Sequence, residues 1–527
     1  MLDSEDQDVI NEIEKRELDE LPFDYLRSLQ SNLSLYYLPI FIILIPILWY
    51  LTTFPYRAAL QPLDPTLDRI LVPYNISIRS KRQWRSPIEE AIQNLQKQHE
   101  NVKFFIKYVV LEEEAGKEFV LDRNGLNLVV FEGKTNLIRF VKEDYVVVEL
   151  KDHYQLENLL KKVLGLERLD IIQKTDENTL DVQSMSVWDR MPISNFYHLQ
   201  LVYLHENGVR SAEKEEKIQR ETEKFVQLAS KYGFYADIGI EHLWDFDVDD
   251  YIEVDQKSGE KRFKNDKLET LTTEVNKGTA WTRSLGIDKP LIKIAIFSLN
   301  DNINFYNNGK LLNGQIIASW GGITSTSVNS TTQSQQKRLF SAVVDIVKAQ
   351  LGVSELPHIL TLLDDNNKAT DVVVDSNDKG LPMEYEWRRF EKAAFLEHCQ
   401  RARAALKTIH LLKKKLEFMV ITREVAVHFY EAHEILVQTL LEARVYGKLD
   451  IKKAIRARLL AERAAAHKDL IDNLDFPFEN RYAMYISLFL PVYHMMYGGG
   501  MAALAFIVFY FKVKRGKEVK GKMLPYY

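Results

Sequence analysis

Two long apolar runs lie near the two ends of the chain. The first, LSLYYLPIFIILIPILWYLTTF, covers residues 33–54 and contains no charged side chain. The second covers residues 484–511, and His494 is its only side chain that titrates near neutral pH. A helix needs about 20 consecutive apolar residues to cross the hydrocarbon core of a bilayer. Each run therefore predicts a transmembrane helix, with a buried core helix as the alternative.

Aromatic residues and prolines in the first run support this interpretation. Tyrosine and tryptophan lie toward both of its ends, as they do at membrane interfaces. Its two prolines disfavour a soluble helix but are tolerated in a membrane. The residues before it are long and acidic, unlike the short basic start of a cleavable signal peptide. The second run is longer than a perpendicular span requires, so we expect tilt or a break at Pro491 or Gly498–Gly500.

Charged residues beside the two runs predict the orientation. Residues 512–522 contain six basic side chains and one acidic side chain, and residues 1–32 contain three basic and ten acidic ones. Basic flanks remain in the cytosol, so the residues after the second run should be cytosolic. Two spans place both termini on the same side. Residues 55–483 should then face the lumen or the exterior.

Two glycosylation sequons fall in the predicted luminal part. Asn75 stands in NIS and Asn329 in NST, and both are candidate N-glycosylation sites. Asn32, in NLS, falls on the predicted cytosolic side and is expected to stay unmodified. The sequons agree with the topology, but sequons also arise by chance.

Between the two runs, the apolar pattern first alternates between strand-like and helix-like segments. Segments 86–100 and 211–234 are predicted helices, and the first opens with Ser86, Pro87 and two glutamates. The predicted strands, rich in Val, Ile, Tyr and Phe, are segments 69–78, 103–111, 126–133, 143–150, 199–206 and 292–300. Interleaved strands and helices predict a mixed α/β layer structure of unspecified strand order. No internal sequence repeat is evident.

From about residue 333 the pattern is mainly helical. Segment 333–352 ends at a glycine. A long helix over 384–419 places one apolar stripe at Phe395, Cys399, Ala402, Leu406, Ile409 and Leu416. The predicted fold is thus a membrane-anchored mixed α/β protein with a helical C-terminal part. Its predicted order is an acidic cytosolic tail (1–32), a span (33–54), a luminal α/β region (55–332), a mainly helical luminal region (333–483), a span (484–511) and a basic cytosolic tail (512–527).

Composition narrows the classes of partner. The 527 residues carry a formal net charge of -6, and the tails hold the strongest imbalances. The nearly neutral middle gives no indication of a nucleic-acid-binding surface. Cys399 is the only cysteine, so an intrachain disulfide is impossible.

The histidines and the cysteine do not form a convincing catalytic or metal pattern. Cys399 follows His398, and neighbours on a helix point about 100° apart, so the pair does not make a dyad. Cys399 also lies on the apolar stripe, which predicts core packing. His428 and His433 are five positions apart, whereas zinc-binding histidines in H-E-x-x-H are four apart. We interpret them as ordinary helix surface.

An acidic cluster, DFDVDD, is the strongest candidate for metal binding. Asp245, Asp247 and Asp249 resemble the start of a calcium loop, but its sixth position is Asp250 rather than glycine and its twelfth is Gln256 rather than glutamate. The alternative interpretation is a solvated acidic loop.

The remaining candidates lie in glycine-containing segments. SWGGI, at 319–323, fits a tight turn in which glycines supply positive φ. The chain has no P-loop, Rossmann glycine pattern or G-x-S-x-G elbow, and no cofactor is predicted. His494 in the second span is a site hypothesis, with a neighbouring helix or a lipid headgroup as partner. Gly498, Gly499 and Gly500 would allow close approach of another helix or a lipid.

Three segments together resemble the PIG-S subunit family of the GPI transamidase complex. TTFPYRAALQPL (Thr52–Leu63) is similar to the tyrosine-arginine-alanine segment of that family, and SWGGI to its W-G-G segment. FPFENRYAMYISLFLPV (Phe476–Val492) is similar to the start of its second span. Spans at both ends of a luminal body also match the family.

The resemblance implies a non-catalytic subunit of an endoplasmic-reticulum membrane complex that joins GPI anchors to the C-termini of precursor proteins. It implies partner subunits that include a caspase-like catalytic subunit, and membrane lipid, including GPI, as a further contact. It transfers no catalytic residue. The alternative hypothesis is a membrane-tethered luminal enzyme that uses Asp245, Asp247 and Asp249 to hold a metal.

Overall fold

Two nine-residue strands, each buried along almost its whole length, lie inside two separate sheets, with a neighbouring strand on either side. They are β1 (Val72–Ser80) and β6 (Tyr197–His205). Continuous burial is typical of parallel strands whose sheets are covered on both faces. A computed structural model describes most of residues 58–468 and isolated positions outside that range, and its longest internal gaps are 111–124, 178–190, 280–289 and 377–383.

The first sheet has seven strands in the order β15-β16-β4-β5-β3-β1-β2. Besides β1 they are β2 (Val102–Val110), β3 (Leu126–Glu132), β4 (Leu137–Val141), β5 (Tyr145–Leu150), β15 (Ile359–Leu363) and β16 (Ala369–Ser376). β2 and β3 flank β1 in parallel, and β5 continues parallel to β3. β16 pairs in parallel with β4, and an ion pair of 3.1 Å joins Arg139 to Asp375, 236 positions later. A late segment of the chain therefore completes this sheet.

The second sheet has five strands in the order β13-β14-β10-β6-β7. Besides β6 they are β7 (Ala236–Leu243), β10 (Leu291–Leu299), β13 (Gly314–Ile317) and β14 (Gly321–Ser327). All are parallel except β13, which is antiparallel to β14. Two short ribbons accompany it, β8 (Ile252–Val254) with β9 (Lys261–Phe263) and β11 (Phe305–Asn307) with β12 (Lys310–Leu312).

Both sheets share one arrangement of their first three strands. α4 (Arg85–Gln98) connects β1 to β2, and α7 (Ala212–Ala229) connects β6 to β7. In each sheet the next strand, β3 or β10, lies on the opposite side of the first. This reversal of strand order creates a topological switch point, the usual place for ligands in open α/β sheets. The two sheets thus repeat a topology without an evident sequence repeat.

Alternation along the strands of the second sheet divides its core between two faces. Leu199, Leu201 and Tyr203 pack with α7 and α9 (Gln333–Leu351) on one face. Val202 and Leu204 pack on the other with α8 (Leu268–Gly278). Successive strand residues point to opposite faces, so each buried strand supplies both cores.

Three helices, α10 (Glu384–Lys415), α11 (Arg423–Tyr446) and α12 (Ile451–Ala465), confirm the predicted helical C-terminal part. Earlier in the chain lie α5 (Leu156–Leu164) and α6 (Leu166–Glu177), and the 3-10 turns η2 (Pro65–Asp68), η3 (Arg82–Trp84), η8 (Ser230–Tyr232), η9 (Asp249–Tyr251) and η10 (Asn265–Lys267). α9 ends at Gly352, whose φ is 65°, as the sequence predicted. The apolar stripe of α10 is buried from Phe395 to Ile409.

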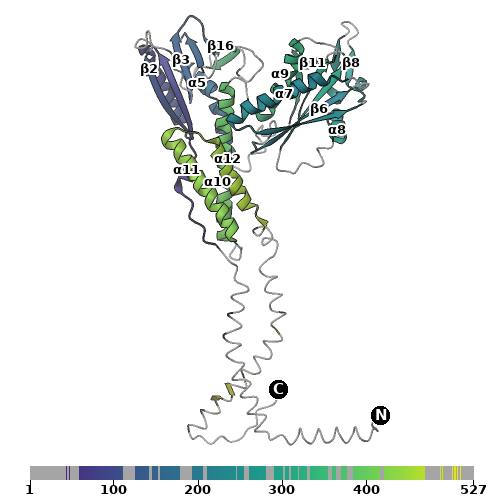
Figure 1. Ribbon diagram of the computed structural model, residues 1–527. Coiled ribbons are helices and arrows are strands. Elements are labelled where there is room, and N and C mark those ends of the chain that lie inside the picture. The colour runs from purple at the N-terminus through teal and green to yellow at the C-terminus, as the bar shows by residue number, and fades with distance from the viewer. Residues whose placement is uncertain are drawn as a thin grey trace, which may run out of the picture. The chain divides into compact units, whose positions relative to one another are not determined.

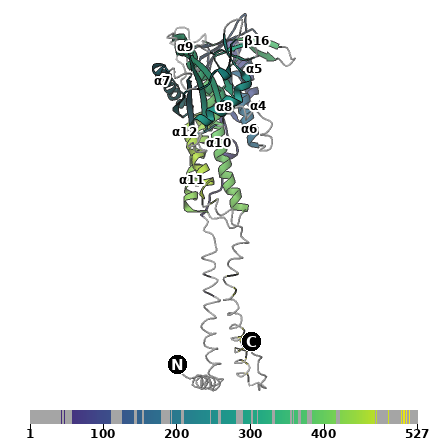
Figure 2. The same ribbon diagram turned by 90° about the vertical axis from the view of Figure 1, so that its right-hand side faces the viewer.

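The first turns of α10 contact both sheets. Tyr385 stacks on Phe140 of β4 with ring centroids 4.0 Å apart. Two residues later, Trp387 packs against Phe225 of α7 in the core of the second sheet. In Figure 1 α10 lies between the two sheets, and in Figure 2 α10 and α12 lie side by side. The helix is therefore a shared wall of both cores.

The chain divides into two units. One consists of Leu60–Ile409 with Val427–Ala465 and contains both sheets. The other consists of Met1–Ala59, His410–Ala426 and Ala466–Tyr527, and within it the Ala58 amide donates to the Ile421 carbonyl at 3.0 Å.

The predicted spans, 33–54 and 484–511, lie almost entirely outside the described residues. Among the residues that are described, no helix combines the length and the apolar character needed to cross a membrane.

A buried ion pair between α9 and α10 offers a test of the shared wall. Lys348 Nζ lies 3.0 Å from Glu386 Oε2, and both side chains are about 5% exposed. Lys348→Met removes the cation beside the buried Glu386 carboxylate, so we expect the free energy of unfolding to fall by about 3–5 kcal/mol. The double variant Lys348→Met with Glu386→Leu should lose clearly less free energy of unfolding than Lys348→Met alone. Urea unfolding followed by tryptophan fluorescence measures both.

The exposed pair of Lys162 and Glu167 provides the control. Its side chains are 40% and 48% exposed, so Lys162→Met should cost less than about 1 kcal/mol. Equal losses in the single and the double variant of the buried pair would contradict the proposed role of its charges.

Candidate functional site

Several residues singled out in the sequence lie outside the described part of the structure. These are Asp245, Asn329, His494 and Gly498–Gly500. Their predicted roles remain predictions.

The acidic loop is exposed where it is described. Asp247 and Asp249 are both exposed, and they flank the buried Val248. Among the described residues they do not belong to any group of His, Cys, Asp or Glu side chains that could hold a metal ion. The geometry of the described residues thus supports a solvated loop anchored by Val248.

His398 and Cys399 are sealed in the helical core. Cys399 is fully buried, and burial raises the pKa of its thiol. Burial also lowers the pKa of His398 to about 3, so its ring is neutral. Its Nδ1 lies 3.2 Å from Arg458 Nη1 and accepts a hydrogen bond from that guanidinium. The predicted core role of Cys399 is confirmed.

The thiol of Cys399 should therefore resist modification in the folded protein. The thiolate is the reactive form, and both burial and the raised pKa suppress it. We expect a maleimide to leave the native chain unlabelled and to label it once after unfolding in denaturant. Intact mass spectrometry measures the labelling, and because Cys399 is the only cysteine no other site can interfere. Rapid labelling of the native chain would contradict the assignment.

His433 has a structural partner. Its Nε2 accepts a hydrogen bond of 3.1 Å from the backbone amide of Asp64, and its ring stacks on Phe429. Neither it nor His428 joins a metal-capable group among the described residues.

The SWGGI segment brings β14 unusually close to β10. Gly321 has φ 147°, and a Cβ at this position would lie 1.7 Å from the carbonyl oxygen of Lys293. The preceding Trp320 donates from Nε1 to Asn276 Oδ1 at 3.2 Å, and this oxygen also accepts from Lys293 Nζ at 2.7 Å. Burial lowers the pKa of Lys293 to about 8. The glycine supplies positive φ as predicted, and the motif has a packing role.

Asn75 lies in β1, between two paired strands, with its side chain engaged. Its Nδ2 donates to the carbonyl oxygen of Gly447 at 2.9 Å. Gly447 has φ 63°, and a Cβ there would meet Asn75 Oδ1 at 2.6 Å and the Phe105 ring at 2.9 Å. An N-glycan attaches to the same Nδ2, so this packing argues against an occupied sequon.

We expect Asn75 to be unmodified in the folded protein. Release of N-glycans by amidase in heavy-oxygen water marks occupied sites by conversion to aspartate, and peptide mass spectrometry should find no mark at Asn75. Asn329→Gln removes the other sequon of the predicted luminal part, and the change in gel mobility that it causes is compared with the change caused by Asn75→Gln. A heavy-oxygen aspartate at position 75 would show that the described packing forms around a glycan.

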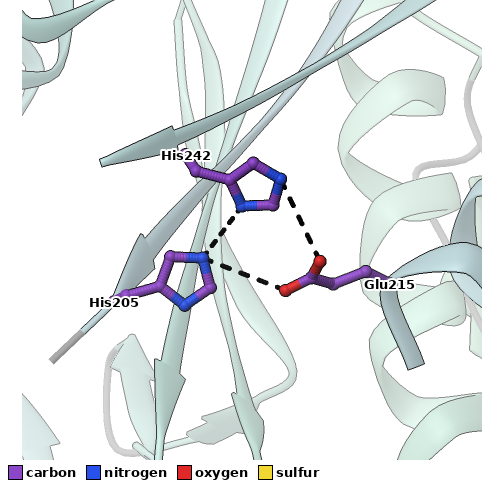
Figure 3. Close-up of side chains that lie close together, drawn as sticks. All are labelled: His205, Glu215 and His242. Carbon is purple, nitrogen blue, oxygen red and sulfur yellow. Dashed lines mark hydrogen bonds and ion pairs between the residues drawn. The ribbon is translucent and has the colours of Figure 1, made fainter. Parts of the chain in front are cut away.

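One cluster of potential ligands emerges from the second sheet. The alternation of β6 and β7 places His205 and His242 on the face covered by α7, near the carboxyl ends of their strands. Glu215 lies in the first turn of α7, where an acidic side chain is favoured by the helix dipole. The β6-α7-β7 unit thus gathers all three, as Figure 3 shows.

The three side chains point toward one another. His205 Nε2 lies 2.9 Å from His242 Nδ1 and 3.9 Å from Glu215 Oε1. His242 Nε2 lies 4.0 Å from Glu215 Oε2. The side chains of His205, Glu215 and His242 are 0%, 8% and 22% exposed. Two imidazoles and a carboxylate therefore share a space that opens to solvent beside His242.

The surroundings fix these orientations. Arg210 Nε donates to Glu215 Oε2 at 2.8 Å, whereas Glu215 Oε1 is buried and accepts no hydrogen bond. The Trp244 ring stacks on His205 at 4.4 Å. Burial lowers the pKa of His242, so its ring is neutral at physiological pH.

The neighbouring switch point is filled by protein. A cavity between α7 and the ends of β10 and β14 has a volume of about 10 Å³, room for about one water molecule. Lys214 closes it by donating to the carbonyl oxygens of Ser327 and Val328 at 2.9 and 2.7 Å. This described crevice is too small for a nucleotide.

Sequence reasoning missed this cluster because it missed β7. The segment ADIGIEHLW was not predicted as a strand, so His242 had no expected position beside His205. The usable signal was a histidine at the end of a buried strand, followed by a helix with an acidic first turn.

The fold defines a mixed α/β protein whose two mostly parallel sheets share a helical part. The sequence matches the family of phosphatidylinositol-glycan biosynthesis class S proteins, PIG-S, over residues 20–507, and the chain belongs to this family. That range includes the three segments on which the resemblance was based. No curated protein sequence matches the chain. Membership places the chain in the biosynthesis of GPI anchors.

Proposed function

We propose that this chain is a non-catalytic scaffold subunit of the GPI transamidase complex. The observation that carries the proposal is the PIG-S family match over residues 20–507. In this role the chain supports attachment of GPI anchors to precursor proteins, and a separate caspase-like subunit performs the cysteine chemistry.

The environment of Cys399 supports a non-catalytic role for this chain. Cys399 is fully buried, and the neighbouring His398 ring is occupied by Arg458. A nucleophile must be exposed to substrate and must face its base. Residues 398 and 399 meet neither condition, so the reaction requires a cysteine from another subunit.

The proposed subunit is held in the endoplasmic-reticulum membrane at both ends. Residues 33–54 and 484–511 form its two spans, the tails 1–32 and 512–527 lie in the cytosol, and residues 55–483 face the lumen. The apolar runs and the basic flank after residue 511 support this topology. Asn329 is the proposed glycosylation site.

The second span supplies a contact inside the membrane. Gly498–Gly500 lack side chains, which permits close approach of a partner helix or of the anchor lipid. His494, one turn away, offers the span's only imidazole for a hydrogen bond to the same neighbour.

Affinity purification of the full chain in mild detergent tests the proposal. A caspase-like cysteine protease and multi-span subunits should co-purify in near-equal amounts by quantitative mass spectrometry. Replacement of Gly498–Gly500 by leucines should reduce their recovery, because the side chains fill the close-contact surface. Ala502→Leu with Ala503→Leu is the control in the same span. Recovery of an intact chain alone would overturn the proposal, and unchanged assembly with three leucines would remove the glycine contact from it.

A further inference from the structure

We propose that His205, His242 and Glu215 bind one zinc ion at the carboxyl end of the second sheet. The site is separate from the proposed scaffold role, and either can fail without the other. It uses one β-α-β unit, with a ligand from each strand and one from the helix between them (Figure 3).

The donor set suits zinc. Imidazole nitrogen and carboxylate oxygen are ordinary zinc ligands, at about 2.0–2.2 Å from the metal. Tetrahedral geometry at that radius separates ligand atoms by about 3.3 Å. One ligand atom from each of the three side chains here lies within 4.8 Å of the other two. Small rotations of the two rings and the carboxylate therefore suffice to surround an ion.

The buried carboxylate oxygen is the second observation that points to a ligand. Glu215 Oε1 accepts no hydrogen bond although it is buried, and it faces the imidazole of His205. Leaving a buried charged oxygen without a hydrogen bond is costly. A cation between the oxygen and the two rings removes that cost.

The neighbouring residues match the second shell of a metal site. Arg210 holds Glu215 Oε2 at 2.8 Å, which leaves Oε1 directed at the rings. Hydrogen bonds to ligating carboxylates orient them in this way. The hydrogen bond between the two rings requires one ring nitrogen as an acceptor, so at least one imidazole already presents a lone pair.

The inferred role of the ion is structural. His205 and Glu215 are almost completely buried, and access is through the partly exposed His242. The ion ties the carboxyl ends of β6 and β7 to the start of α7. β7 is an edge strand, so it has a strand neighbour on one side only, and the ion adds a further tie to the sheet.

The first experiment measures zinc in the full chain, purified in detergent with a tag that lacks histidine. After dialysis, elemental mass spectrometry should find one zinc ion per chain, and His242→Asn should abolish it. His198→Asn is the control: His198 is buried on β6, the strand of His205, and its partner Asp237 lies on β7, the strand of His242. Stoichiometric zinc in this control supports the site. Absence of zinc from the unaltered chain, or equal loss in the control, overturns it.

Two further measurements test the same site by other physical properties. Zinc added to the metal-free chain should raise the midpoint of thermal unfolding, because it binds the folded state, and should leave His242→Asn unchanged. X-ray absorption at the zinc edge should report only nitrogen and oxygen neighbours with imidazole scattering. A sulfur neighbour would assign the metal to Cys399 and overturn the proposal, as would a midpoint that zinc does not move.

Discussion

The fold depends on the first two turns of α10, which form one wall of two separate sheets. Tyr385 is committed to the first sheet through Phe140, and Trp387 to the second through Phe225. Between them Glu386 pairs with Lys348 of α9 in a buried setting. Three consecutive residues thus contact three different elements, β4, α9 and α7, and the helical backbone fixes the directions of their side chains. A shift of α10 along its axis would break all three contacts together. This short segment of α10 therefore packs against both sheets at once.

A repeated strand order has different consequences in the two sheets. In the second sheet the reversal lies beside α7, and Lys214 fills the crevice where an open α/β sheet usually receives a ligand. The group of potential metal ligands, His205, Glu215 and His242, lies instead at the adjacent ends of β6 and β7. In the first sheet the carboxyl end of β1 is buried, and Ser80 there shares a hydrogen bond with the Tyr108 hydroxyl of β2. Fold topology therefore offers sites, and local side chains decide whether they stay open.

The strongest apolar runs could be predicted from the sequence, and the reasons are physical. β1, β2, β3, β5, β6 and β10 are rich in Val, Ile, Leu and aromatic residues, and the apolar stripe of α10 has helical spacing. β7 was not predicted because its polar residues and its glycine weaken the alternation of apolar and polar positions. β16 was not predicted because it lies within a mainly helical part of the chain and pairs with β4, a strand far away in the sequence. The zinc ligands depend on β7 and on long-range geometry, which a single sequence pattern does not encode.

The late pairing of β16 with β4 makes the second sheet an insertion within the first. During synthesis the ribosome releases β4 long before β16, so every strand of the second sheet emerges while the edge of the first is still open. An open edge invites pairing with other chains, and long-range closure is slow because the intervening chain must first be ordered. Assembly of the second sheet shortens that intervening chain. The first sheet therefore cannot be completed until the whole second sheet has been synthesised.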